Sequence, residues 1–217
     1  MSAIEVTVVD YGVGNLFSVQ RSLEHCGAHV TVTSDKACIL ASPRVVLPGV
    51  GAFANGISAL RKLDLVDVIG EVAARGTPLL GICLGMQLLL DESEEFGVNQ
   101  GLGLIPGRVV PIPAVGIDGG MLKRPHIGWS ELLPAAGGRD WTGTVLSGNR
   151  SGDAFYFVHS FMAVPAQAEY RIADCDYGGH RLPAVIARGN VTGCQFHPEK
   201  SGEAGLRLIR SFCETMP

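Results

Sequence analysis

The sequence predicts an α/β protein with a mixed, mostly parallel sheet and helices on both faces. Over the first 90 residues, short β-rich runs alternate with segments whose apolar residues recur at helical spacing. The second half is rich in glycine, proline and strand-forming residues, which favours additional antiparallel strands. The chain has 217 residues, of which 47% are hydrophobic and 18% charged, so we expect residues 1–217 to form one domain.

The predicted elements of the first half follow one another closely. The run IEVTVV forms the first strand, and the segment at 15–26 is a helix that places Leu16, Val19 and Leu23 on one face and stops at Gly27. A glycine-rich turn, PGVG, follows the third strand directly. The other elements expected here are strands at 29–33, 44–47 and 77–82 and helices at 57–65, 67–74 and 85–91.

The second half is expected to contain five further strands and a closing helix. The helix at 203–214 carries Leu206, Ile209 and Cys213 on one face, which predicts that it packs on the sheet. The sequence contains no internal repeat and no linker. The strands are expected at 107–112, 154–158, 169–175, 183–188 and 191–196.

Composition and charge argue against several classes of partner. The net charge is −4 and no basic run is present, so a nucleic-acid partner is not expected. The most apolar stretch, 78–90, is broken by glycines and is shorter than the roughly 20 residues that a membrane span needs. Six scattered cysteines without a CxxC pair favour reduced thiols and give no metal-site pattern. We expect a cytoplasmic protein with no membrane partner and no metal.

Cys83 lies between two glycines at a predicted corner between a strand and a helix, in the run GICLG. At such a nucleophile elbow the residues two before and two after the nucleophile pack against each other, and glycine relieves the clash. The N–H groups and dipole of the following helix favour a thiolate. The alternative is a buried core cysteine, but that alternative does not explain Gly81 and Gly85.

His197 and Glu199 are the predicted partners of this thiol. His197 follows the last predicted strand, and in an extended segment residues i and i+2 point the same way, so Glu199 can reach the ring. A carboxylate there would fix the tautomer of the imidazole and stabilise its protonated form. The sequence therefore predicts a Cys83–His197–Glu199 catalytic triad.

The motifs GICLGMQLL and QFHPEKSG resemble those of the class I glutamine amidotransferases, which use such a triad. Three further motifs, PGVGAF at 48–53, PHIGW at 125–129 and YFVHSF at 156–161, narrow the resemblance to the glutaminase subunit of imidazole glycerol phosphate synthase. The resemblance runs from DYGVGN near the N-terminus to EKSG, which is nearly the whole chain. It implies the class I glutamine amidotransferase fold, which is flavodoxin-like, and no cofactor.

The resemblance implies a role for each matching residue. Cys83 would attack the glutamine carboxamide, form a γ-glutamyl thioester and release ammonia, with His197 as base and then acid. Gln87 and Glu95 would hold the amino-acid end of glutamine, although Glu95 alone also reads as a solvated charge. The backbone around Ser160 and Phe161 would assist them. The oxyanion hole would combine the N–H of Leu84 with one from the turn Gly49, Val50 and Gly51, whose peptide is expected to flip.

The family passes its ammonia to a separate (β/α)8-barrel synthase subunit, which makes imidazole glycerol phosphate and an aminoimidazole carboxamide ribonucleotide. The resemblance implies that Gly12 and Asn15 lie at the partner interface near the ammonia exit. His126 and Lys200 would belong to interface or signalling regions, with a structural role as the alternative for either. Without the resemblance, the run GVGN after a strand would suggest a phosphate-binding turn of a dinucleotide site. The dinucleotide-binding motif needs a third glycine, however, and Phe17 stands at that position.

Two positions depart from the family pattern. Ser130 follows PHIGW where asparagine is usual, and Phe161 follows YFVHS where tyrosine is usual. These departures leave open a paralogous glutaminase that feeds a different barrel, for example in surface-sugar amidation. A non-catalytic regulatory homologue is a further alternative, against which the intact triad argues.

Overall fold

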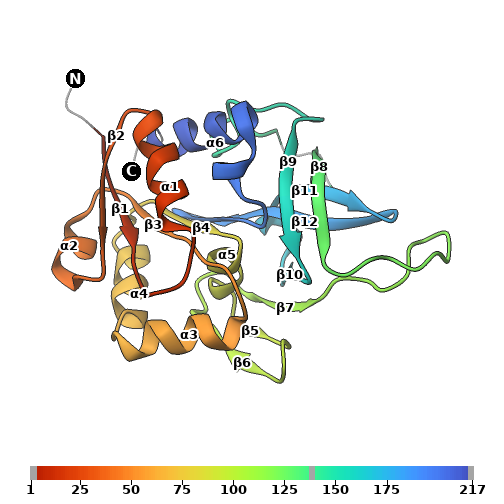
Figure 1. The fold of residues 1–217 in the computed structure, drawn as a ribbon, viewed down its shortest axis with the longest axis horizontal. Coiled ribbons are helices and arrows are strands. Elements are labelled where there is room, and N and C mark those ends of the chain that lie inside the picture. The colour runs from red at the N-terminus through yellow and green to blue at the C-terminus, as the bar shows by residue number, and fades with distance from the viewer. Residues whose placement is uncertain (1–3, 137–139, 215–217) are drawn as a thin grey trace.

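A nine-stranded sheet crosses the molecule in the order β2-β1-β3-β4-β13-β12-β11-β8-β9 (Figure 1). The computed structural model describes residues 4–136 and 140–214. The pairs from β2 to β13 are parallel and the pairs from β13 to β9 antiparallel. The strands are β1 Ile4–Val9, β2 Ala28–Thr33, β3 Val45–Leu47, β4 Leu79–Ile82, β8 His126–Pro134, β9 Ala154–His159, β11 Arg171–Tyr177, β12 His180–Arg188 and β13 Val191–Cys194.

A second, four-stranded sheet has the order β10-β7-β5-β6. Its buried residues Val109 and Ala163 pack into the same core as one face of the main sheet. The strand predicted at 107–112 therefore exists but belongs to this smaller sheet. The strands are β5 Glu92–Ser93, β6 Asn99–Gln100, β7 Gly107–Pro111 and β10 Phe161–Pro165.

Helices cover both faces of the main sheet, which confirms the predicted architecture (Figure 1). On one face α1 (Leu16–His25) and α6 (Gly202–Glu214) pack on the sheet. The opposite face carries four helices, α2 Lys36–Ala41, α3 Phe53–Lys62, α4 Val66–Ala74 and α5 Leu84–Leu88. The structure also contains two 3₁₀ turns, η1 Ala168–Tyr170 and η2 Pro198–Lys200.

Side chains of the central strands alternate between the two cores. Val8 and Leu80 face the core under α1 and α6, whereas Val9 and Leu79 face the opposite core. Each of these four side chains is at most 1% exposed. Full burial of such a side chain contributes about 1.5–3 kcal/mol, so the apolar runs read from the sequence are what holds the two layers on the sheet.

The helix predicted at 57–65 begins earlier, at Phe53, and ends at Lys62. The residue before it, Ala52, has no side chain that can cap the helix, so the sequence lacks a local start signal. The cap comes from Glu95 instead, whose Oε2 accepts a hydrogen bond of 2.6 Å from the N–H of Phe53. A start signal supplied by a residue 42 positions away is invisible to a local pattern.

Helix α2 and the strands β8 and β10 were not predicted. Helix α2 is only six residues long, and its cap, Asp35, which accepts from the N–H of Cys38 at 2.8 Å, reads equally well as a turn residue. Strand β8 exposes Ile127 and Trp129 on one side and has Gly128 and Ser130 on the other, so its hydrophobic alternation is weak. Its neighbours β9 and β11 supply the pairing that defines it.

The corner between β4 and α5 is packed too tightly for any side chain at its glycines. A Cβ on Gly81 would lie 2.8 Å from the carbonyl carbon and oxygen of Gly85. A Cβ on Gly85 would lie 1.9 Å from the carbonyl oxygen of Leu47. The two glycines at this corner therefore allow α5 to approach both its own strand and β3.

We predict that Gly85→Ala lowers the free energy of unfolding by about 3 kcal/mol or more, because the backbone of β3 would have to move. The matched control is Gly70→Ala in α4, where a Cβ meets no atom within 4 Å. This control should gain about 0.5–1 kcal/mol from its lower backbone entropy. Chemical denaturation measures both variants, and equal stabilities would contradict the packing argument.

Candidate active site

Cys83 occupies the corner between β4 and α5 in a backbone conformation that side chains rarely adopt. Its φ is 53° and its ψ −110°, and its N–H donates to the carbonyl of Cys194 at 2.8 Å. The thiol borders a cavity of about 290 Å³, which is at the small end of ligand pockets and suits a single amino acid. The cavity is lined by Val50, Gly51, Cys83, Leu84, Gln87, Glu95, Pro125, Val158, His159, Ser160, Phe161 and His197.

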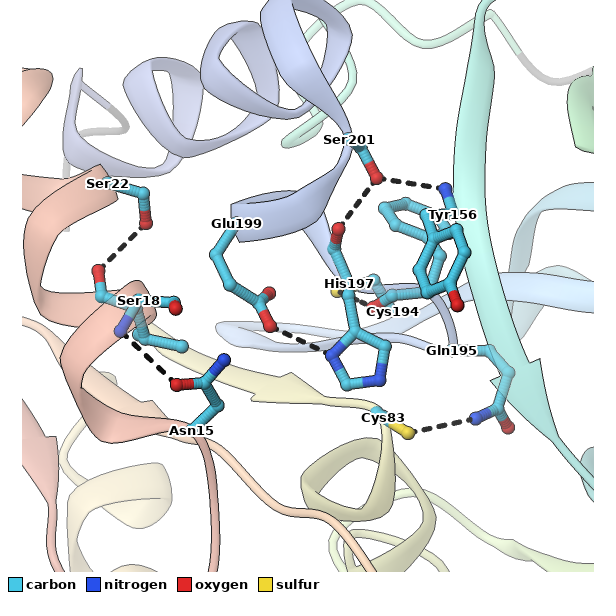
Figure 2. A network of polar contacts seen from close by, with 12 residues as sticks. Asn15, Ser18, Ser22, Cys83, Tyr156, Cys194, Gln195, His197, Glu199 and Ser201 are labelled. Carbon is cyan, nitrogen blue, oxygen red and sulfur yellow. Dashed lines mark hydrogen bonds and ion pairs between the residues drawn. The ribbon is translucent and has the colours of Figure 1, made fainter. Parts of the chain in front are cut away.

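The backbone of His197 is held from both sides. Its N–H donates to the carbonyl of Tyr156 at 2.9 Å, and its carbonyl accepts from Oγ of Ser201 at 2.6 Å. The same Ser201 hydroxyl accepts from the N–H of Tyr156 at 3.0 Å, which closes a small network (Figure 2). Strand β13 ends at Cys194, slightly before the predicted end, and the extended residues after it carry the imidazole to the cavity.

The His197 ring lies between Glu199 and Cys83 (Figure 2). Its Nδ1 is 2.9 Å from Oε1 of Glu199, and the two side chains are 2% and 1% exposed. Its Nε2 is buried, has no hydrogen-bond partner among the described residues and points towards the Cys83 sulfur. The structure therefore brings together the three residues predicted as a triad, with the free ring nitrogen on the side of the thiol.

Two opposing effects act on the pKa of His197. Burial lowers it, because the charged imidazolium loses its hydration. The adjacent Cys83 and Glu199 side chains act in the other direction, first by hydrogen bonding to the ring and then by charge, and outweigh burial, so the pKa of His197 rises to about 9. The pocket thus favours a protonated His197 when its neighbours are anionic, which is the form that can deliver a proton to a leaving group.

The glycine-rich turn at 48–51 lies against Leu84, and its Gly49 carbonyl faces the N–H of Leu84. The N–H of Leu84 donates to the carbonyl of Gly49 at 3.3 Å, and Oη of Tyr11 donates to the carbonyl of Pro48 at 2.6 Å. A Cβ on Gly49 would lie 2.6 Å from that hydroxyl and 2.9 Å from Cβ of Leu84. In this conformation the N–H predicted to serve an oxyanion is already occupied by Gly49.

Gln87 and Glu95 line the cavity. Each has one side-chain oxygen that accepts none of the hydrogen bonds described below. Nε2 of Gln87 donates to the carbonyl of Phe161 at 3.2 Å and to Oε1 of Gln195 at 3.0 Å. Both N–H groups of that amide are then used, which leaves its carbonyl oxygen for a ligand. Glu95 uses Oε2 to cap α3 and keeps Oε1.

Sequence reasoning missed Gln195, which is fully buried and belongs to the polar network of the site. Its Nε2 lies 3.8 Å from Sγ of Cys83 (Figure 2). The signal was present in the motif, because Gln195 stands two residues before His197 in an extended segment and points to the same side. The lining residues Pro125, Val158 and His159 were also missed, since only the pairing of β8 with β9 brings these segments to the cavity.

The four residues predicted at a partner interface fall into two groups. Gly12 and Lys200 are exposed, and Asn15 is half-buried and caps α1 by accepting from the N–H of Ser18 at 3.4 Å. His126, by contrast, is 3% exposed and stacks between Phe157 and Tyr177. Little of its side chain is exposed to a partner, and its place in an interface or signalling region stays a prediction.

A second cavity, of about 530 Å³, is larger but lies away from this cluster. Its lining includes Asp140 and Thr142 but neither a cysteine nor a histidine, so it offers no cysteine–histidine pair. Over residues 4–136 and 140–214, no group of three or more potential metal ligands comes together. No helix in the same ranges is long and apolar enough to cross a membrane.

The family model described as glutamine amidotransferase class-I matches residues 7–216. The chain belongs to the class-I glutamine amidotransferases. Among curated relatives of this amidotransferase, the imidazole glycerol phosphate synthase subunit HisH 1 of Legionella pneumophila (strain Lens) is 49% identical, over 96% of this chain and 98% of that protein. The subunit HisH of Geobacillus thermodenitrificans (strain NG80-2) is 45% identical, over 95% and 94%. The resemblance drawn from the motifs is confirmed.

Solved structures show the same amidotransferase fold at much lower identity. A chain of PurLQS from Thermotoga maritima superposes with a TM-score of 0.72 at 21% identity, covering 97% of each chain. A glutamine amidotransferase from the same organism gives a TM-score of 0.61 at 15% identity, covering 92% of this chain and 77% of that one. At these identities the comparison supports the fold alone.

We predict that Cys83→Ala lowers the pKa of His197 from its value of about 9, because burial then acts against Glu199 alone. An NMR titration of the His197 ring in the amidotransferase measures this change. Cys38→Ala is the control, since Cys38 is exposed and lies outside the cavity, and it should leave the titration unchanged. A pKa that is the same in Cys83→Ala and in the unsubstituted protein would show that the thiol and the imidazole are not coupled.

Proposed function

We propose that this chain is the glutaminase subunit of an imidazole glycerol phosphate synthase and hydrolyses glutamine through Cys83, His197 and Glu199. The observation that carries the proposal is the arrangement of Nε2 of His197, which faces the elbow thiol while Nδ1 is held by Glu199 at 2.9 Å. The similarity to HisH subunits over nearly the full chain supports the assignment to this synthase. We further propose that residues 1–217 form one amidotransferase domain.

The first half of the reaction forms a thioester. Nε2 of His197 accepts the proton of the Cys83 thiol, and the sulfur attacks the side-chain carbonyl carbon of glutamine. The tetrahedral intermediate collapses when the same nitrogen returns the proton to the leaving amine, so that ammonia departs and a γ-glutamyl thioester remains. Glu199 keeps Nδ1 protonated throughout and stabilises the imidazolium.

The second half regenerates the thiol. His197 now accepts a proton from water, the resulting hydroxide attacks the thioester, and glutamate leaves as Cys83 recovers its proton. No cofactor takes part in either half. The free carbonyl oxygen of Gln87 and Oε1 of Glu95 accept hydrogen bonds from the α-ammonium group of the substrate. The backbone around Ser160 and Phe161 completes that end of the cavity.

The oxyanion of both tetrahedral intermediates requires a change in the turn at 48–51. The carbonyl of Gly49 currently accepts from the N–H of Leu84, so it stands where an oxyanion would bind. Rotation of the Gly49–Val50 peptide would replace that carbonyl by the N–H of Val50, next to Leu84. Support comes from Val50, which is 41% exposed, and from Gly51, whose φ of +98° and open surroundings leave room for rotation.

A (β/α)8-barrel synthase subunit is the proposed recipient of the ammonia. The exposed Gly12 and Lys200 and the half-buried Asn15 form the proposed contact surface. They come from neighbouring segments, since Ser18 of α1 and Glu199 of η2 line one shallow surface pocket. We place the complex in the cytoplasm, and the six cysteines, all of them free, are as expected in a reducing compartment.

The proposed function is tested by glutamine hydrolysis with and without the barrel partner and its phosphoribulosyl-formimino nucleotide. We expect little hydrolysis by the chain alone, a large rise with the partner and nucleotide, and loss of activity in Cys83→Ala. Hydrolysis that survives Cys83→Ala would exclude the proposed nucleophile. Stimulation by another barrel protein, but not by this one, would favour a paralogue that serves a different acceptor.

The contact surface is tested in the same assay with Lys200→Ala. Loss of a charge that pairs across the interface should lower the partner-stimulated rate by about fivefold or more. Lys36→Ala is the matched control, because Lys36 is exposed and pairs with Asp64 on this chain at 3.2 Å. Equal stimulation of the two variants would remove Lys200 from the interface.

A further inference from the structure

A chain of hydrogen bonds leads from strand β8 into the cavity through two buried histidines. Ser130 Oγ lies 2.9 Å from Nε2 of His126. Nδ1 of His126 lies 3.0 Å from Nε2 of His159. Nδ1 of His159 lies 2.8 Å from the carbonyl oxygen of Phe161. Since Gln87 bonds to the same oxygen, the chain reaches the residue proposed to hold the substrate.

The Phe161 carbonyl fixes the direction of every bond in this chain. A carbonyl only accepts, so Nδ1 of His159 must carry a proton, and Nε2 of a neutral His159 then accepts from Nδ1–H of His126. Nε2 of His126 in turn accepts from the Ser130 hydroxyl. In a neutral pair both rings are therefore protonated on Nδ1. Burial, which lowers the pKa of His126 and takes that of His159 to about 4, is consistent with this neutral pair.

The same carbonyl determines the orientation of Gln87. With His159 and Gln87 both donating to it, its two lone pairs are used, and the atom of Gln87 beside it must be nitrogen. The second N–H of that amide then meets Oε1 of Gln195 at 3.0 Å, and Nε2 of Gln195 faces Cys83. The oxygen of Gln87 is left to the cavity only while this arrangement holds.

We propose that His126 and His159 are positioning residues that, through the Phe161 carbonyl, hold the Gln87 amide with its oxygen directed at the ammonium group of the bound amino acid. The inference rests on the proposed function, since it explains how the same cavity holds the amino-acid end of glutamine. The other tautomer would turn the lone pair of His159 Nδ1 towards the Phe161 carbonyl, and protonation of both rings would place two N–H groups face to face between them. His126 thus acts on the cavity from its position between Phe157 and Tyr177.

The matched test compares His126→Asn with His126→Leu. Asparagine can place its Nδ2 donor near the position of the histidine Nδ1, whereas leucine has a similar size and no donor. Both variants lose the ring stacking on Phe157 and Tyr177, so a purely structural role affects them alike. The measured quantity is glutamine binding by calorimetry, with each substitution in a Cys83→Ser background to prevent turnover.

We expect His126→Leu to raise the Kd for glutamine by about fivefold or more, which is the loss of roughly one buried hydrogen bond. His126→Asn should stay within about twofold of the Cys83→Ser parent. Equal affinities in the two variants would overturn the positioning role. Absence of glutamine binding in the Cys83→Ser parent would instead contradict the proposed function, and the inference would fall with it.

Two further measurements avoid the risk that a substitution at buried His126 prevents folding. Ser130→Ala removes only the outer donor and should weaken glutamine binding, whereas Ser130→Asn keeps a donor and should preserve it. In addition, nitrogen-15 NMR of the unsubstituted protein at neutral pH should show both rings protonated on Nδ1. A His159 ring protonated on Nε2 would overturn the inference without any substitution.

Discussion

The parallel pairing of β4 with β13 is the contact on which the cavity depends. The register places Ile82 beside Cys194, and the N–H of Cys83 donates to the carbonyl of that residue at 2.8 Å. Because parallel strands end at the same edge of a sheet, the residues that follow them meet there. One strand is thus followed by Cys83 and the other by Gln195, His197 and Glu199, although Gln195 and Cys83 are 112 residues apart.

Close backbone approach makes this edge rigid. Gly193 on β13 faces α5, and a Cβ there would lie 2.6 Å from Cγ of Met86. Gly193, Gly81 and Gly85 together let α5 lie against both neighbouring strands. The backbone that carries the Cys83 thiol is therefore tightly packed. The polar groups above it are held by hydrogen bonds to backbone carbonyls, among them those of Phe161 and Tyr156. The Cys83 thiol and the His197 imidazole are therefore positioned before any ligand arrives, whereas the turn at 48–51 still has to change to receive an oxyanion.

Much of the fold and of the candidate site could be predicted from the sequence, because both depend on local patterns. Alternating strands and helices gave the parallel half of the sheet, and the glycines around Cys83 gave the corner. Because side chains two residues apart in an extended chain point the same way, the sequence also placed Glu199 beside His197. The elements that escaped prediction depend on distant partners: α3 starts where Glu95 caps it, and β8 exists because β9 and β11 pair with it.

The same distinction explains the residues of the site. His126 read as an interface residue because its motif was known, whereas its burial between two rings depends on the fold. The conformation of the Gly49 carbonyl, which accepts from the N–H of Leu84, likewise depends on the packing around the turn, because Gly49 itself permits more than one backbone conformation. Sequence patterns identify which groups are present, and the paired strands decide which of them meet.

The central claim is that Cys83 is the nucleophile and that His197 activates it. A glutamine analogue with an electrophilic ketone in place of the carboxamide tests it directly, with the modified residue found by peptide mass mapping. The account predicts that Cys83 alone among the six cysteines is labelled, that glutamine slows the labelling, and that His197→Gln slows it strongly. Labelling of another cysteine, or a Cys83 rate independent of His197, would contradict it.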